Sequence, residues 1–365
     1  MVNHLGNWRN GELGNFITLK RGFDLPQQKR EDGQVPIFSS SGITGTHSTA
    51  MVNAPGVITG RYGTIGEVFY AAEDFWPLNT TLFVEDFHGN DAEFIYYFLK
   101  TLEWSKFTSA SAVPGINRNT VHKETVSLPD IETQRRIAST LSMLDEKIKT
   151  NTEINDNLAD LLQTIYQERF VNDILAVNQG VLSDICSYSR DKVAVSELNI
   201  RTYFSTENML SGKAGSTEAT SLPTTSQTTA CHKGDTLISN IRPYFKKIVY
   251  CEDNCGCSTD VLCFTPSQPR YSAYLFSTLY ADKFFAFMVA GSKGTKMPRG
   301  DKQQIMTYPV VLPSEEALAG FNTIAPPLLE QIYSNRAENK RLSILRDTLL
   351  PKLMSGEIDV SAVQL

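Results

Sequence analysis

Two groups of basic, aromatic and amide side chains are the residues of this 365-residue sequence best suited to a chemical task. Arg61-Tyr62 follows an apolar segment in the first half, and Arg242-Pro-Tyr244 follows a similar segment in the second half. Arginine and asparagine can form paired hydrogen bonds with guanine and adenine, and cations on Gly/Ser loops can follow a phosphate backbone. This pattern favours contact with a nucleic acid, and a solvated surface loop is the alternative.

Patterns of catalysis are missing from the sequence. It contains no G-x-x-x-x-G-K-[ST] loop, no H-E-x-x-H helix and no G-x-S-x-G elbow. The glycines around Gly60 and Gly66 do not complete G-x-G-x-x-G, and no amino-methyltransferase signature (Asn or Asp, then Pro-Pro and an aromatic residue) occurs. We therefore expect no catalytic residue, and an enzyme ranks last among the functions considered.

Four cysteines cluster in the second half, at positions 251, 255, 257 and 263. Their C-x3-C-x-C-x5-C spacing differs from a zinc ribbon, which uses two C-x2-C pairs. We expect reduced thiols, no bound metal and no cofactor, with a structural metal site as the alternative.

The elements that carry these residues occur twice. The segment from Ala54 to Tyr62 is echoed from Lys233 to Tyr244. Each copy continues into an apolar strand, an acidic turn with a second strand, an aromatic helix and a strand ending in Leu-Pro, at 128–129 and again 184 residues later at 312–313. The shared order predicts an internal duplication.

A long helix follows each copy, and both show heptad spacing with asparagines inside the apolar stripe. Two such stripes predict an antiparallel coiled coil within the chain, although each helix could instead pack on its own domain. The first helix should run from Ile137 to Arg169, whereas Pro326-Pro327 should start or kink the second and Pro351 should end it near Leu350. The predicted seam, meaning the positions that face the other helix, comprises Ile137, Leu141, Leu144, Ile148, Asn151, Asn155, Leu158, Leu162, Ile165, Leu328, Ile332, Asn335, Asn339, Leu342, Leu345 and Leu349.

Charge is distributed unevenly along the chain, whose net charge is −6. The net charge is −4 over residues 1–130, −3 over 131–180, +3 over 181–312 and −2 over 313–365. Acidic helices suit contact with protein better than contact with DNA. No apolar run is long enough to span a membrane, no signal sequence begins the chain, and cysteines are few, so we expect a cytoplasmic protein.

In this order the motifs resemble the specificity (S) subunits of type I restriction–modification systems. The resemblance rests on Pro36-Ile-Phe-Ser-Ser-Ser-Gly-Ile-Thr-Gly45 with Arg61-Tyr-Gly-Thr-Ile-Gly66, and on Ser205-Thr-Glu-Asn-Met-Leu210 with Lys233-Gly-Asp235. It also rests on Leu128-Pro129 followed by Gln134-Arg-Arg-Ile-Ala138, and on the end from Leu349 to Ile358. The second helix departs from the pattern, because Phe321 and its neighbours replace the usual entry glutamine.

The resemblance implies an α+β protein with two repeated target-recognition domains separated by two long helices in an antiparallel coiled coil. The domains would be residues 1–130 and 181–312, and the helices would be 131–180 and 313–365. Each domain would read one half of a split double-stranded DNA site. The coil would set the spacing and dock two modification (methyltransferase) subunits, and restriction (motor) subunits would join them. S-adenosylmethionine, ATP and Mg²⁺ would reside on those partners, so this chain would not be an enzyme.

Candidate DNA contacts come from both copies. We expect Arg61 and Arg242 to match each other across the repeat, and we expect the chain alone to bind DNA weakly because its first domain is acidic. The rival hypothesis is a scaffold with two heads that binds only proteins and leaves no DNA footprint. The candidates are Lys20, Arg21, Ser39, Ser40, Ser41, Thr44, Arg61, Tyr62, Asn117 and Arg118 in the first copy, and Asn208, Lys213, Asn240, Arg242, Tyr244, Lys246, Lys293, Lys296 and Arg299 in the second.

Overall fold

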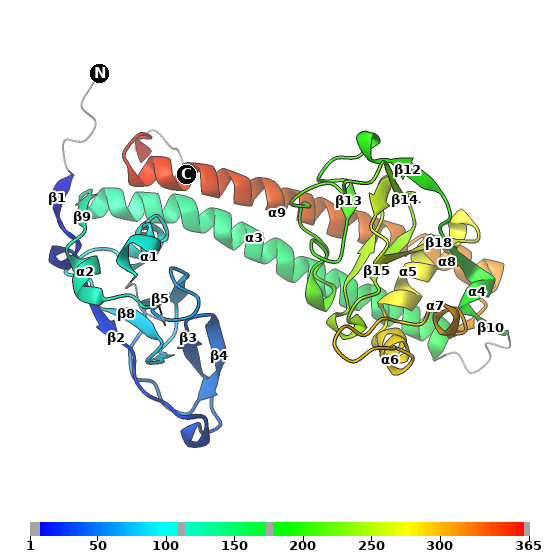
Figure 1. Cartoon of the computed structure of the whole chain (residues 1–365), viewed down its shortest axis with the longest axis horizontal. Helices are drawn as coiled ribbons and strands as arrows, with labels where there is room; N and C mark the ends of the chain where they lie inside the picture. The colour runs from blue at the N-terminus through cyan, green and yellow to red at the C-terminus, as the bar shows by residue number, and fades with distance from the viewer. Residues whose placement is uncertain (1–7, 109–113, 173–177, 361–365) are drawn as a thin grey trace. The chain divides into compact units, whose positions relative to one another are not determined.

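The computed structural model describes residues 8–108, 114–172 and 178–360, which divide into two compact units (Figure 1). The first unit combines residues 1–149 with 339–365, and the second comprises residues 150–338. Two long helices, α3 (Ile131–Tyr166) and α9 (Ala325–Met354), contribute residues to both units. Among the described residues, no helix is both long and apolar enough to cross a membrane.

The first unit is built on a four-stranded antiparallel sheet of order β2-β8-β5-β6. Its central strand β5 is fully buried, and helix α1 packs on the sheet through an apolar face that includes Phe94 and Phe98. A three-stranded sheet (β4-β3-β7) and a two-stranded sheet (β1-β9) complete the fold. The elements are β1 (Arg9–Glu12), β2 (Thr18–Arg21), β3 (Val35–Ser39), β4 (Gly42–His47), β5 (Gly56–Gly60), β6 (Val68–Ala71), β7 (Trp76–Pro77), β8 (Thr81–Asp86), α1 (Ala92–Lys100), α2 (Arg118–His122) and β9 (Thr125–Leu128).

The second unit repeats this topology. Its main sheet has the order β11-β18-β15-β16, and β12-β14-β17-β13 and β10-β19 correspond to the two smaller sheets. The elements are β10 (Gln179–Val181), α4 (Leu182–Ile185), β11 (Cys186–Tyr188), β12 (Lys192–Ala194), β13 (Tyr203–Phe204), β14 (Gln227–Cys231), β15 (Thr236–Ser239), β16 (Ile248–Tyr250), β17 (Cys255–Cys257), β18 (Val261–Pro266), α5 (Ser272–Tyr280), α6 (Asp282–Ala290), α7 (Lys302–Ile305), β19 (Pro309–Val311) and α8 (Glu315–Asn322).

Strand pairing confirms the internal duplication. Ile58 pairs with Phe83 in the first sheet, and Leu237 pairs with Cys263 in the second. Strand β8 and helix α1 begin at residues 81 and 92, and their counterparts β18 and α5 begin 180 residues later at 261 and 272. The offset reaches 184 at α2 and α7, so the second copy has gained four residues between the aromatic helix and this point.

The entry of α3 is fixed by Gln134, which is fully buried. Its Nε2 donates to Asn90 Oδ1 (2.8 Å) and to the carbonyl oxygen of Pro129 (2.9 Å), while its Oε1 accepts from the backbone N–H of Asp91 (3.0 Å). This amide therefore joins the Leu-Pro turn to the start of α1. The offset of 184 places Leu318 at the equivalent position in α8, where it is buried among apolar residues. Leu318, not Phe321, thus replaces the glutamine.

Prolines shape the second long helix in two ways. The helical segment that corresponds to the start of α3 stops at Asn322 as α8, and α9 begins at Ala325, so Pro326 and Pro327 occupy its first turn. The predicted break before this pair is confirmed. The predicted end near Leu350 is wrong, because α9 continues through Pro351 to Met354. In the first copy, α3 starts six residues before the predicted Ile137 and is followed by the π-helical turn Gln167–Val171.

Helices α3 and α9 run antiparallel within each unit. In the second unit, Asn335 Nδ2 donates to Asn155 Oδ1 (2.9 Å) and Asn151 Nδ2 donates to Glu338 (2.7 Å). In the first unit, Asn339 Nδ2 donates to the carbonyl oxygen of Ile148 (3.1 Å). These asparagines are buried or half-buried, and most predicted apolar seam positions are at least half-buried as well. Leu345 is an exception with 46% exposure, so it does not face α3 as expected.

Cysteines fill a core of the second unit. All six are free and buried, and Cys231 joins the four that the sequence showed as a cluster. Cys263 Sγ donates to Asp235 Oδ2 (3.2 Å), and the sulfur atoms of Cys251 and Cys255 lie 3.6 Å apart. Burial raises the pKa of the Asp235 carboxyl. Within the described ranges, no three His, Cys, Asp or Glu residues are grouped so as to hold a metal ion.

Candidate nucleic-acid interface

Six candidates from the first copy line one hollow of the first unit. The hollow has a volume of about 610 Å³. Its wall combines the end of β2, the residues that follow β5, and the start of α2. Residues 109–113, which precede the α2 side of this wall, lie outside the described residues. The lining residues are Lys20, Arg21, Arg61, Tyr62, Leu82, Gly115, Ile116, Asn117, Arg118 and Asn119.

Arg61 is held in place by backbone contacts on two sides. Its N–H donates to Thr80 O (2.9 Å), its carbonyl accepts from Ile116 N (3.1 Å), and its Nε donates to Ile116 O (3.3 Å). Its guanidinium lies over the ring of Tyr62, 4.5 Å from the centroid. A Cβ atom at Gly115 would lie only 2.2 Å from that ring, so glycine is needed for Tyr62 to pack here.

The other cations of the hollow differ in their pairing. Lys20 forms an ion pair with Glu85, and Arg21 lies 3.5 Å from Asp24. Arg118 is exposed, and no carboxylate among the described residues pairs with it. Arg118 therefore offers the charge of this wall most freely to a ligand.

Helix α2 is fixed at both ends. Asn117 caps its start, because its side-chain oxygen accepts from Asn119 N (3.0 Å), which leaves the NH₂ group for a ligand. At the other end, His122 Nε2 accepts from the backbone N–H of Leu19 (2.9 Å). Burial, helped by the charge of Arg118, lowers the pKa of His122, and the neutral ring is the form that can accept.

The serines predicted from the β3–β4 turn lie near the hollow but do not line it. Ser39 Oγ donates to the carbonyl oxygen of Gly42 (3.1 Å) and accepts from Ser41 N (3.2 Å), so it stabilises the turn. Ser40 Oγ lies 3.3 Å from where a Cβ at Gly63 would be, which places it beside the segment after Arg61. Thr44 is exposed on β4.

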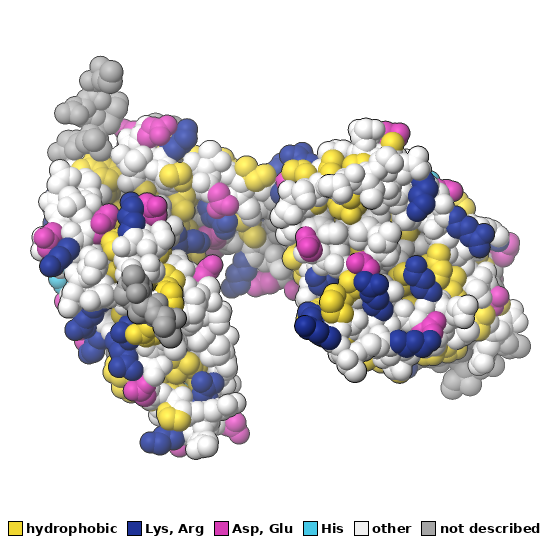
Figure 2. Space-filling model, viewed as in Figure 1, with side chains coloured by type: hydrophobic (Ala, Val, Ile, Leu, Met, Phe, Trp, Pro, Cys, Tyr) yellow, Lys and Arg dark blue, Asp and Glu magenta, His cyan; other side chains and the backbone are white. Residues whose placement is uncertain are grey.

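Candidates from the second copy gather on two touching loops of the second unit. The β15–β16 loop spans residues 240–247, and the α6–α7 loop spans residues 291–301. The backbone N–H of Arg242 donates to Pro298 O (2.8 Å), and Gly300 N donates to Asn240 O (3.3 Å). Figure 2 shows Lys and Arg side chains gathered around exposed hydrophobic ones on this face of the second unit.

Most lysines and arginines here have acidic neighbours. Asp282 accepts from Lys213 (2.7 Å) and Lys246 (3.0 Å), and these bonds lower the pKa of its carboxyl. A hydrogen bond from Lys293, together with hydrogen bonds from backbone N–H groups, likewise lowers the pKa of the Asp301 carboxyl. Arg299 pairs with Asp260 (2.9 Å). Such exposed pairs contribute little to stability and can reopen toward a phosphate.

Lys296 and Arg242 differ from these residues, because no described carboxylate pairs with either side chain. The Nε of Arg242 and the Oδ1 of Asn240 are both buried, and no described residue forms a hydrogen bond with either atom. These two polar atoms of one loop therefore retain unused hydrogen-bonding capacity, which is uncommon in protein interiors.

The structure corrects the expected match between Arg61 and Arg242. Asn240 N donates to Asp260 O (2.8 Å), and Asn240 O accepts from Gly300 N, as Arg61 does with Thr80 and Ile116. Asn240 is therefore the equivalent of Arg61. In the β15–β16 loop the arginine comes two residues later, at Arg242. The similar sequences around Arg61 and Arg242 therefore do not occupy equivalent positions.

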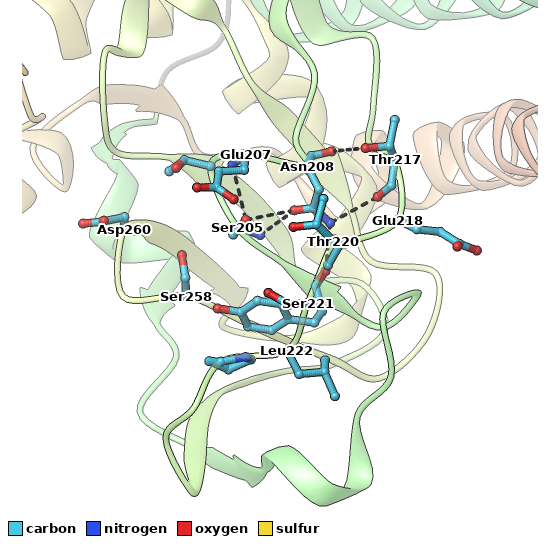
Figure 3. Close-up of a pocket in the computed structure, with 14 residues that line it drawn as sticks. Ser205, Glu207, Asn208, Thr217, Glu218, Thr220, Ser221, Leu222, Ser258 and Asp260 are labelled. Atoms are coloured by element: carbon cyan, nitrogen blue, oxygen red, sulfur yellow. Dashed lines mark hydrogen bonds between the residues drawn. The ribbon is translucent and has the colours of Figure 1, made fainter. Parts of the chain in front are cut away.

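Asn208 is not placed to contact a base. Only 4% of it is exposed, and its amide NH₂ donates to Tyr203 O (2.9 Å) and Thr217 O (3.1 Å). Its Oδ1 accepts from Ser205 N (2.6 Å). Figure 3 shows this asparagine bonded to its own loop, at the wall of a pocket that also holds Glu207 and Glu218.

Two exposed apolar residues were missing from the prediction. Phe245 is 38% exposed beside Tyr244, and Met297 is 50% exposed on the α6–α7 loop. The sequence contained a signal for the first, because Tyr-Phe between cations is unusual for a turn. Met297 had no such signal.

Comparison with known proteins gives a consistent result. Residues 6–159 match the family model described as "Type I restriction modification DNA specificity domain". The chain is 22% identical to the type I restriction enzyme MjaIX specificity subunit of Methanocaldococcus jannaschii, covering 74% of this chain and 70% of the relative. It is 31% identical to the HindI specificity subunit of Haemophilus influenzae, but over only 28% of this chain and 24% of the relative.

The fold is also similar to a solved structure. The crystal structure of a type I restriction–modification system S subunit from M. genitalium matches with a TM-score of 0.68 and 18% identity, covering 97% of each chain. At this identity the likeness concerns the fold.

Proposed function

We propose that this chain is a specificity subunit of a type I restriction–modification system and that each repeat reads one half of a bipartite DNA site; the family-model match, the similar curated subunits and the shared fold support this. Reading would use the hollow of the first unit and the paired loops of the second. The observation that carries this proposal is the topological equivalence of the two surfaces. Both follow the central strand, β5 or β15, and both adjoin a short capped helix, α2 or α7.

The two surfaces have the chemistry that DNA requires. Each combines arginine or lysine with an amide and an aromatic ring, which suits contact with both phosphates and base edges. Most of their ion pairs are solvent-exposed, so phosphates can displace the carboxylates at little cost. Since the first domain is acidic, the partner subunits would supply part of the positive charge around the duplex.

The long helices would form an antiparallel coiled coil that sets the spacing between half-sites. Helix α3 alone is roughly 50 Å long at 1.5 Å per residue, which exceeds one turn of B-DNA. Buried asparagine pairs such as Asn155 and Asn335 fix register and orientation in coiled coils. Two equivalent acidic helix surfaces would dock two modification subunits.

Chemistry would reside on those partners. In this proposal the modification subunits bind S-adenosylmethionine and methylate the DNA, and restriction subunits use ATP and Mg²⁺. The complex would act in the cytoplasm. This chain would supply sequence recognition and assembly only.

Co-expression with a type I methyltransferase subunit, followed by methylome sequencing, tests the proposal. We expect a split motif with one methylated adenine in each half, and none when the specificity chain is omitted. A complex that assembles but leaves no methylated motif and no DNA footprint would support the protein-only scaffold instead.

A further inference from the structure

We propose that Tyr244 and Phe245 form a wedge that inserts at a base-pair step of the half-site read by the second repeat. This inference rests on the proposed function and deepens it. It implies that the DNA is locally unstacked in the half-site read by the second repeat and not in the half-site read by the first. The two side chains are 50% and 38% exposed, and their ring centroids lie 4.8 Å apart. Together they present a continuous aromatic surface to solvent.

The loop holds this pair outward at an energetic cost. Arg242 and Lys246, on either side of the 3-10 turn Pro243–Phe245, have φ values of 50° and 51°, in the left-handed region that side chains other than glycine rarely adopt. Such a conformation is strained for these residues and persists only where its surroundings impose it.

Several contacts impose the conformation. Lys213 N donates to the carbonyl oxygen of Lys246 (2.9 Å), Arg242 N donates to Pro298 O (2.8 Å), and Pro243 is buried. Helix α6 packs against the turn, and Lys246 Nζ reaches its first residue, Asp282 (3.0 Å). The aromatic pair is therefore preorganised rather than mobile.

Charge around the pair favours DNA as its occupant. The two loops, residues 240–247 and 291–301, include the cations Lys246, Lys293, Lys296 and Arg299. A further cation, Lys213, hydrogen-bonds to the first loop. Cations position a phosphate backbone, while apolar wedges enter between base pairs and unstack them. An aromatic ring can stack on any base, so the wedge would not read base edges directly. It would instead discriminate between sequences by how easily their base-pair steps unstack.

The equivalent segment of the first repeat lacks this feature. There Tyr62 is covered by the Arg61 guanidinium and packs on Gly115. Between residues 61 and 67, all of which the structure describes, no other aromatic residue occurs. The first reader therefore offers a hollow, and the second offers a projection.

The test uses the complex of this chain with its methyltransferase subunit, bound to an unmethylated duplex that carries the motif identified by methylome sequencing. 2-Aminopurine replaces one base at a time through both halves. We expect a fluorescence rise at one step of the half read by the second repeat, apart from any rise at the methylated adenine. The double variant Tyr244→Ala/Phe245→Ala should abolish that rise and weaken binding about 10- to 100-fold.

Two matched variants sharpen this experiment. Exchanging the rings in Tyr244→Phe/Phe245→Tyr keeps the aromatic surface and should retain the signal. Ile200→Ala removes another exposed apolar side chain of the same unit (41%) and should change neither fluorescence nor affinity. All variants alter exposed side chains, so their unfolding midpoints should match that of the wild type.

Two failures can be distinguished. If the wild-type complex neither binds nor methylates a motif, the proposed function itself fails. If it binds and methylates, but no step outside the methylated adenine responds, the wedge is overturned. Loss of methyltransferase binding in the double alanine variant would also overturn it, since the pair would then be a protein contact.

Discussion

The two repeats share a fold but differ in the part that would meet DNA. In the first, Arg61 lies flat over Tyr62 at the edge of a hollow. In the second, Asn240 occupies the position of Arg61, and the loop continues into the exposed pair Tyr244 and Phe245. The comparison shows that duplication preserved the strands and left the connection after β5 and β15 free to change.

The cores behind these surfaces differ in the same way. Strand pairing makes Val52, Ala71, Phe75, Pro77 and Phe83 the equivalents of Cys231, Cys251, Cys255, Cys257 and Cys263. Thiols thus stand where the first unit has two phenylalanines and three smaller apolar residues. A neighbouring position differs along with the core. In the first unit it is Gly56, because a Cβ there would lie 2.1 Å from the Phe75 ring. In the second unit it is Asp235, whose side chain lies beside the thiols.

The largest expected effect comes from truncating equivalent core residues. Phe75→Ala should lower the free energy of unfolding by about 3–5 kcal/mol, because it leaves a large cavity around a fully buried ring. Cys255→Ala should cost about 1 kcal/mol, since a thiol is small. Urea unfolding measures both, and equal losses would contradict the difference in packing between the two cores.

Arg61→Ala should have the next largest effect. It should weaken binding of the complex to DNA about 10- to 100-fold and relax specificity in one half of the motif only. The assay compares methylation rates on duplexes with single substitutions in each half. Lys29→Ala removes an exposed cation outside the hollow and serves as the control. A loss spread over both halves would argue against two separate readers.

Asn155→Leu tests the buried amide pair between α3 and α9. The single variant should cost about 1–2 kcal/mol, because the Nδ2 group of Asn335 loses its acceptor inside the protein. Asn155→Leu/Asn335→Leu should recover most of that loss through apolar packing. Unfolding of the double-mutant cycle measures the coupling, and additive losses would show that the two amides do not interact.

Asp235→Asn gives the smallest effect and changes with pH. Burial raises the folded-state pKa of this carboxyl, so its contribution to stability is present below its unfolded pKa and is lost as pH rises through the folded value. The asparagine variant should therefore lose less stability than the wild type between acidic and neutral pH. Melting curves from pH 4 to 8 measure this, with exposed Asp253→Asn as the control. Parallel pH profiles would contradict it.

Much of the fold followed from the sequence because hydrophobic spacing and the repeated order of elements are local signals. The strands, the aromatic helices and the buried asparagines all carried such signals. The register between repeats did not, because the offset is 179 at β5 and 180 at β8, and Arg242 lies two residues beyond Asn240, the true counterpart of Arg61. Asn208 had a typical recognition side chain, but its loop consumes every bond that its amide can make.

Two predictions about helix α9 were also wrong, one for Pro351 and one for Leu345. Pro351 has no N–H to donate to the preceding turn, yet α9 continues for three residues beyond it, so the proline does not terminate the helix. Leu345 fits the heptad by spacing but is exposed, whereas Leu342 and Leu349 on either side of it are half-buried.

The central claim is that each repeat reads its own half of one DNA site. The most direct test replaces residues 181–312 with the same segment of another specificity subunit and sequences the methylome of cells that also express the methyltransferase. We expect one half of the motif to change while the other half stays as in the wild type. A change in both halves, or in neither half despite methylation, would contradict the account.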